Sequence, residues 1–165
     1  MKKYEFTGET KEIRLLFRTA TLHRIRATVA FGIVEVGDLG GWIEKEENLS
    51  HEGKAWVWGN AEVWGNAEVC GDAKVWGNAE VFSASHVLVI GAIGSRNDFT
   101  TFYRDKDNEI TVKCGCFLGK IDRFLEKVTQ THGDSKYALV YRAAVEVAKL
   151  QIDLSGEAPK DADEE

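Results

Sequence analysis

The sequence lacks any long apolar run and has few cysteines. Its start, "MKKYEFTGETKEIRLLFRT", is charged before it is apolar and contains no small-residue cleavage site. We therefore expect neither a signal peptide nor a membrane span. The cysteines are Cys70, Cys114 and Cys116, an odd number, and the C-x-C pair is too tight for an ordinary disulfide. Reduced thiols fit a cytoplasmic protein.

Positive charge is scarcer than negative charge. Lys and Arg number 21 against 27 Asp and Glu, which gives a net charge of -6. A general nucleic-acid-binding protein needs a concentrated positive surface, so the composition argues against that class. Part of the acidity lies in "EAPKDADEE", which holds the only proline and almost no apolar residue. We predict a disordered acidic tail over residues 155–165.

The most regular feature of the sequence is a six-residue repeat that begins at Ala55. Its units include "AEVWGN", "AEVCGD" and "AKVWGN". Ala and Val alternate with Glu and Trp, and Gly-Asn supplies a corner where positive φ is tolerated. Three sides of six residues make a coil of about 18 residues, which is typical of hexapeptide-repeat solenoids. A flat sheet or sandwich would need hairpin signals, which the repeat lacks.

The predicted fold is mainly β with some α structure. A short left-handed parallel β-helix occupies residues 39–94, and residues 1–38 form strands that cap it. Residues 95–154 form a small C-terminal α+β module of two strands and two helices, a ββαα arrangement. The strands are a hairpin at 99–104 and 110–114, and the helices follow from apolar residues at helical spacing.

The repeat also predicts which side chains point inward. The inner column consists of alternating Ala and Val: Ala55, Val57, Ala61, Val63, Ala67, Val69, Ala73, Val75, Ala79 and Val81. The coil length stacks Trp58 on Trp76, and Trp64 on Phe82, on the outer faces. Contiguous exposed apolar patches usually mark contacts. Three copies around a parallel axis is the common solution for such prisms, so we predict a homotrimer.

The predicted oligomer interface is made of the outward aromatic residues Trp56, Trp58, Trp64, Trp76 and Phe82. Two alternatives remain for these side chains. The flanking segments of the same chain cover them, or they stack against a ligand.

Several polar residues are candidates for binding an anion. The run "GSRND" supplies Arg96 and Asn97 after the last coil, and Tyr103 and Arg104 lie on the adjacent hairpin. Arg24 and Arg26 belong to the most positive segment of the chain. Arginine can hold a phosphate through two hydrogen bonds. The alternative is that these arginines pair with nearby carboxylates.

Catalytic and metal chemistry have weaker signals. The candidate bases for an acyltransferase are His23, His51, His86 and His132, but none has a distinctive spacing to a carboxylate. By the repeat register His86 points outward. Cys114 and Cys116 with His132 lack the two-pair spacing of zinc sites. We therefore expect no enzyme, no metal and no cofactor.

Two stretches carry a resemblance to a known group of proteins. "GDLGGWIEKEENLSHEGKAWVWGNAEVWGNAEV" and "IGSRNDFTTFYRDKDNEITVKCGCFLGKIDRFLEKVTQTHGDSKYA", with "LGGWIE" and "CGCF" as their more specific parts, resemble small accessory proteins encoded by phages and prophages. These combine hexapeptide repeats with this C-terminal module. The resemblance implies a trimeric left-handed β-helix that acts in the cytoplasm of the host cell.

The resemblance also implies an accessory role against host defence. We predict a non-catalytic protein that sequesters a small anionic, nucleotide-like immune signal in an oligomer. The first alternative is an inhibitor that binds a host defence protein directly. An acyltransferase and a structural or assembly protein are the other two.

Overall fold

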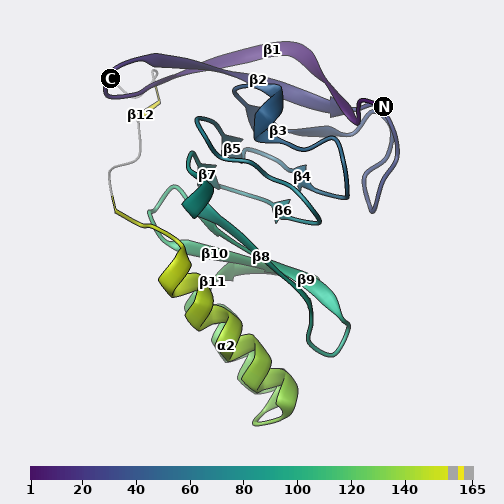
Figure 1. Cartoon of the computed structure of the whole chain (residues 1–165), viewed down its shortest axis with the longest axis vertical. Helices are drawn as coiled ribbons and strands as arrows, with labels where there is room; N and C mark the ends of the chain where they lie inside the picture. Colours follow the sequence, from purple (N-terminus) through teal and green to yellow (C-terminus); the bar gives the residue numbers. More distant parts are fainter. Residues whose placement is uncertain (156–159, 162–165) are drawn as a thin grey trace.

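The computed structural model describes residues 1–155 and 160–161. In this part of the chain, the N-terminal strands, the repeat, and the C-terminal sheet with its helices follow one another along the molecule (Figure 1). None of the described helices is long and apolar enough to cross a membrane. Residues 156–159 and 162–165, on which most of the predicted acidic tail falls, lie outside the described residues. The short strand β12 (Lys160–Asp161) pairs antiparallel with the first strand of the chain.

The N-terminal layer is an antiparallel hairpin of two long strands, β1 (Tyr4–Arg14) and β2 (Thr19–Ala27). The strand β3 (Leu39–Ile43) pairs antiparallel with β2. On its other side β3 pairs parallel with β5 (Glu62–Val63). This sheet therefore mixes antiparallel strands from the N-terminus with parallel strands from the repeat.

The repeat itself forms very short strands. β4 (Trp56–Val57) pairs parallel with β6 (Lys74–Val75), and β5 pairs parallel with β7 (Glu80–Val81). Each of these strands is two residues long, and two-residue turns such as Gly59-Asn60 and Gly65-Asn66 recur between the short extended segments. After β7 the chain passes through a 3-10 turn at Ala84–His86 and enters an antiparallel sheet.

The predicted left-handed parallel β-helix is therefore wrong. The chain is a mixed α/β structure whose sheets are mostly antiparallel or mixed. The physical reason is that the repeat strands do not continue as coils at either end. At one end β3 joins the antiparallel hairpin, and at the other end the chain leaves the parallel pairing after Val81. The expectation of three copies depended on the β-helix and loses that basis.

The C-terminal layer is a four-stranded antiparallel sheet covered by helices. Its strands are β8 (Val87–Ile93), β9 (Asp98–Arg104), β10 (Ile110–Cys114) and β11 (Phe117–Lys120), in the order β11-β10-β9-β8. The helices are α1 (Ile121–His132) and α2 (Lys136–Gln151). The predicted hairpin and both helices are confirmed, but the sheet has four strands instead of two. The domain boundaries stay a prediction.

The inner column of the repeat is confirmed. All ten of its Ala and Val residues are buried, together with Ile43 and Leu49. The predicted ring stacking is confirmed as well. The rings of Trp58 and Trp76 stack with their centroids 4.4 Å apart, and those of Trp64 and Phe82 with centroids 4.9 Å apart. The alternation of side chains therefore predicted the local packing correctly, although the overall fold class was wrong.

The N-terminal hairpin covers two of the repeat tryptophans. Trp64 packs in a cluster with Ile13, Ala20, Leu22 and Trp42, and is almost fully buried. Its indole therefore contacts side chains of the same chain, as one of the sequence alternatives proposed. The assignment of the aromatic set to an oligomer interface stays a prediction.

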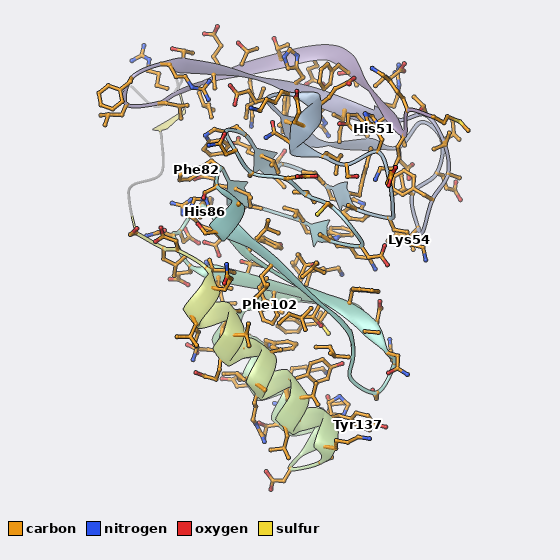
Figure 2. All side chains as sticks on the ribbon, viewed as in Figure 1. His51, Lys54, Phe82, His86, Phe102 and Tyr137 are labelled. Carbon is orange, nitrogen blue, oxygen red and sulfur yellow. The ribbon has the colours of Figure 1, made fainter. Side chains whose placement is uncertain are left out.

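The first residues of the chain close over Trp56. The ring of Tyr4 lies edge-on to that indole, with centroids 6.2 Å apart, and its hydroxyl donates to the Leu49 carbonyl at 2.9 Å. The ammonium of Lys3 donates to the Ala55 carbonyl at 2.7 Å. Figure 2 shows His51, which stacks on Tyr4, beneath the N-terminal strands. The N-terminus is thus tied to the start of the repeat.

Candidate ligand-binding site

A partly open cavity lies at the far end of the C-terminal sheet. The β8–β9 turn supplies Ser95 and Arg96, and the β10–β11 turn supplies the C-x-C segment. The last turns of α1 add Lys127 and His132, and α2 adds Tyr141. The cavity has a volume of about 190 Å³. Segments that are far apart in the sequence therefore meet at one concave surface.

Aromatic side chains form the inner wall of the cavity. The rings of Phe117 and Phe124 lie 5.4 Å apart, and Phe124 contacts Tyr141 edge-on at 5.7 Å. His132 lies 5.7 Å from the same tyrosine ring. An apolar cavity of about 150 Å³ can hold benzene. The cavity here therefore has room for one ring-sized group, with the rest of a larger ligand at the open side.

Cationic side chains lie at the rim of the cavity. Arg96 and Lys127 both line it, and both are exposed. Within residues 1–155 and 160–161, no ion pair joins either of them to a carboxylate. Asp98 is the only carboxylate recorded among the lining residues. The rim is therefore more positive than the chain as a whole, whose net charge is -6.

Tyr141 anchors the floor of the cavity. Burial raises the pKa of its phenol to about 12, and the neighbouring Cys114 thiol, which hydrogen-bonds to it, adds to this rise. The phenol is therefore neutral at physiological pH and can donate a hydrogen bond. A Cβ atom at Gly94 would lie 1.9 Å from the Tyr141 hydroxyl, and this glycine has a φ of +78°. Only glycine allows the β8–β9 turn to approach the phenol so closely.

The structure places the predicted ligand-binding residues in different parts of the chain. Arg96 lines the cavity, and Asn97 follows it in the same turn with a φ of 47°. Tyr103 is buried on β9 and donates its hydroxyl hydrogen to the Trp76 carbonyl at 2.9 Å. Arg24 and Arg26 lie on β2, in the other layer of the molecule. The predicted set is therefore not one site.

Arg104 is part of the joint between the repeat and the C-terminal sheet. Its side chain is 0% exposed. Its Nε donates to Asn108 at 2.9 Å, and its Nη1 lies 3.6 Å from the Glu80 carboxylate. The guanidinium also lies 5.0 Å from the centre of the Phe82 ring. These contacts match the sequence alternative in which an arginine pairs with a carboxylate.

The N-terminal arginines also contact the protein itself. Arg26 donates to Glu5 through Nε and Nη2, at 3.1 and 2.6 Å. Arg24 lies 5.4 Å from the centre of the Trp42 ring. Both residues stabilise the N-terminal sheet, and neither reaches the cavity.

Of the four histidines, His132 is the one recorded in the lining of this cavity. His86 is 3% exposed, so the outward direction predicted from the repeat is wrong. Its Nδ1 accepts a hydrogen bond from the Phe82 amide at 3.2 Å, and Figure 2 shows the two residues near each other. His51 and His23 stack on Tyr4 and Phe6.

The two cysteines of the C-x-C segment lie near His132. Cys114, Cys116 and His132 all line the cavity. Even so, the described part of the chain contains no group of three or more His, Cys, Asp or Glu side chains placed to hold a metal ion. The thiol of Cys114 instead accepts a hydrogen bond from Thr100 at 3.3 Å.

Sequence reasoning missed Lys127 and Tyr141 as site residues. Both lie on correctly predicted helices, and the helical spacing placed Tyr141 on an apolar face. No local signal shows which turn of the sheet that face contacts.

A search against protein-family models and curated protein sequences finds no match.

Proposed function

We propose that the protein is a non-catalytic binding protein that takes up a small anionic ligand containing a ring. The cavity between the β8–β9 turn and the helices carries this proposal, because it combines an aromatic wall with the unpaired cations Arg96 and Lys127 at its rim. Aromatic rings can stack on a nucleobase, and arginine can neutralise a phosphate. A nucleotide-like molecule has both groups.

The cellular role follows from the resemblance of the sequence to phage and prophage accessory proteins. In this proposal the protein is made by a phage in the host cytoplasm and sequesters a nucleotide immune signal. Sequestration needs only binding. The raised pKa of Tyr141 keeps its phenol protonated at neutral pH, so it can donate a hydrogen bond to the ligand.

The size of the cavity restricts the ligand. A volume of about 190 Å³ holds one ring system, and the phosphate would lie outside it against the rim. A mononucleotide therefore fits better than a molecule in which two bases must be buried together. We expect AMP or 3′,5′-cyclic AMP to bind more tightly than uncharged adenosine.

The experiment titrates the protein with each of these three compounds and measures the binding affinity by isothermal titration calorimetry. The double variant Arg96→Ala, Lys127→Ala should weaken binding of AMP and cyclic AMP at least tenfold, with little effect on adenosine. Arg26→Ala is the matched control, because this arginine is paired with Glu5 on the N-terminal sheet. It should bind like the native protein.

Native mass spectrometry of protein purified from bacteria extends the test beyond the chosen probes. A retained small molecule that contains phosphate, and that is lost in the double variant, would support the proposal. Failure of all three probes, together with native protein that carries no retained molecule, would contradict it. Equal binding by native protein and double variant would contradict the assigned site.

A second candidate function is direct binding of a host defence protein. The turn between β1 and β2 favours it, because Leu16 is 88% and Phe17 is 94% exposed. Adjacent large apolar residues at a hairpin tip are unusual, since turns favour small and polar residues. If Leu16→Ser, Phe17→Ser abolishes protection of a phage while the pocket double variant does not, this second function is the correct one.

A further inference from the structure

Helix α2 is apolar on two opposite faces. Its inner face packs Ala138, Tyr141, Ala144, Val145 and Ala148 into the core between the sheet and the helices. A helix at the surface of a globular protein normally presents charged and polar residues on its other face. In Figure 1 this helix lies on the outside of the C-terminal layer, away from β1 and β2.

The outer face of α2 carries Leu139, Ala143, Val147 and Leu150, which we call the outer stripe. These residues recur at intervals of four, four and three, so they lie along one side of the helix. Leu139 is 60%, Val147 is 47% and Leu150 is 89% exposed. Single exposed apolar residues are common, but a continuous stripe of them marks a contact surface.

Three residues of the outer stripe, Leu139, Ala143 and Val147, have the symmetry that a two-fold contact requires, and Leu150 lies beyond this symmetric part. Ala143 lies near its middle, with Leu139 and Val147 four residues away on either side. If two copies of α2 pack antiparallel around Ala143, Leu139 of each copy meets Val147 of the other. The small alanine side chain lets the helix axes come close at the centre. Such a self-complementary patch is the requirement for an isologous dimer.

The charges beside the outer stripe match the same arrangement. Arg142 and Glu146 lie on the same flank of the helix, one turn apart and with opposite charges. Antiparallel packing around Ala143 brings Arg142 of one copy to within about 3 Å, along the helix axis, of Glu146 of the other, and this happens twice. Arg142 is held on this flank by hydrogen bonds from Nη2 to Thr129 and to the Gly133 carbonyl. Both side chains also have partners within the chain: the Nη1 of Arg142 lies 3.7 Å from the Asp134 carboxylate, and Glu146 lies 3.6 Å from the Lys149 ammonium. These are surface ion pairs, which contribute little to stability, and the contact between two copies would replace them.

We propose that the outer stripe of α2 is a homodimer interface, in which two copies of this helix pack antiparallel around a two-fold axis at Ala143. This proposal is independent of the ligand cavity, because the outer stripe and the cavity involve different residues of α2. It replaces the trimer expected from the repeat.

The first test is the mass of the protein in solution. Sedimentation equilibrium from low to high micromolar concentration should show a dimer of the full chain. Ala143→Arg and Leu139→Glu place a charge at the centre of the contact and should give monomers. Leu16→Glu, at an even more exposed leucine of the β1–β2 tip, is the matched control and should remain dimeric.

The second test uses charge reversal to identify the antiparallel arrangement. In Arg142→Glu, two glutamates face each other at each contact between the copies, and in Glu146→Arg two arginines do. Each variant alone should therefore dimerise at least tenfold more weakly than the native protein. A mixture of the two restores one glutamate and one arginine at both contacts. The mixture should therefore form a heterodimer, which native mass spectrometry identifies from the masses of the two variants.

Each other outcome overturns the proposal. A native protein that is monomeric throughout, a trimer, or a dimer that survives Ala143→Arg and Leu139→Glu would each show that the outer stripe is not the interface. Because Arg142 also contacts Gly133, circular dichroism and thermal melting must show that the variants are folded. If folded charge-reversal variants mix without forming the heterodimer, the antiparallel arrangement is wrong.

Discussion

The guanidinium of Arg104 lies 3.6 Å from the carboxylate of Glu80, and the two residues belong to different layers of the molecule. Glu80 is on the last short strand of the repeat, and Arg104 ends a strand of the C-terminal antiparallel sheet. The same guanidinium also donates to the Glu80 carbonyl at 3.2 Å. The pair therefore fixes the position of the repeat relative to the sheet.

Replacement of Arg104 should destabilise the protein strongly. Arg104→Ala removes a fully buried cation and leaves Glu80 without this partner, so we expect a loss of about 3 kcal/mol in the free energy of unfolding. Arg26→Ala removes an exposed ion pair and should cost about 1 kcal/mol or less. Urea unfolding of both variants measures the difference. Equal losses would show that the Arg104 pair is not a structural joint.

The corners of the repeat offer a matched pair of glycine substitutions. Gly53 and Gly59 have φ values of +66° and +59°, so alanine is strained at both, by about 1–2 kcal/mol. A Cβ at Gly53 would also lie 2.4 Å from the Gly71 carbonyl oxygen, whereas nothing lies within 4 Å at Gly59. Gly53→Ala should therefore unfold at a clearly lower urea concentration than Gly59→Ala. The reverse order would contradict the close approach of these two turns.

The buried His86 should make stability depend on pH. Burial, helped by the nearby Arg104 cation, lowers the pKa of His86 below its usual value of 6.5. The unfolded chain therefore binds a proton more readily than the folded chain, and stability falls as the pH drops below about 6.5. Above that pH the histidine is neutral in both the folded and the unfolded state, so it adds no pH dependence to the free energy of unfolding.

The variant His86→Asn tests this dependence. Its side-chain oxygen can still accept the hydrogen bond from the Phe82 amide, but it has no titratable group. The free energy of unfolding, measured in urea at pH 7 and pH 5, should fall less between these values in the variant than in the native protein. An identical fall in both proteins would show that His86 does not titrate with unfolding.

The alternation within the repeat was a reliable guide to local packing. Ala and Val alternate with larger side chains, so their burial and the stacking of Trp58 on Trp76 could be predicted from period alone. The course of the chain before and after the repeat could not be predicted in this way. Trp64 is covered by β1 and β2, which come from a segment whose contact with the repeat has no local signal. The wrong fold class came from extending a local pattern through both ends.

The candidate site was predictable only in part. Arg96 was identified because it follows the last predicted coil of the repeat and because arginine can bind a phosphate. Lys127 and Tyr141 join it through the packing of two helices on the sheet, and the sequence does not state which end of the sheet they reach. Arg104 was proposed for the same chemistry, but its side chain is buried against Glu80, and the sequence does not show which carboxylate the fold places beside it.

The hydrogen bonds from Lys3 and Tyr4 to Ala55 and Leu49 constrain the order in which the chain can fold during translation. The N-terminal residues emerge first, yet their partners are synthesised some fifty residues later. The apolar face of the β1–β2 hairpin therefore stays uncovered until the repeat has left the exit tunnel of the ribosome. Folding of the N-terminal half is consequently tied to the progress of translation through the repeat, and a pause before the repeat would prolong the exposure of that face.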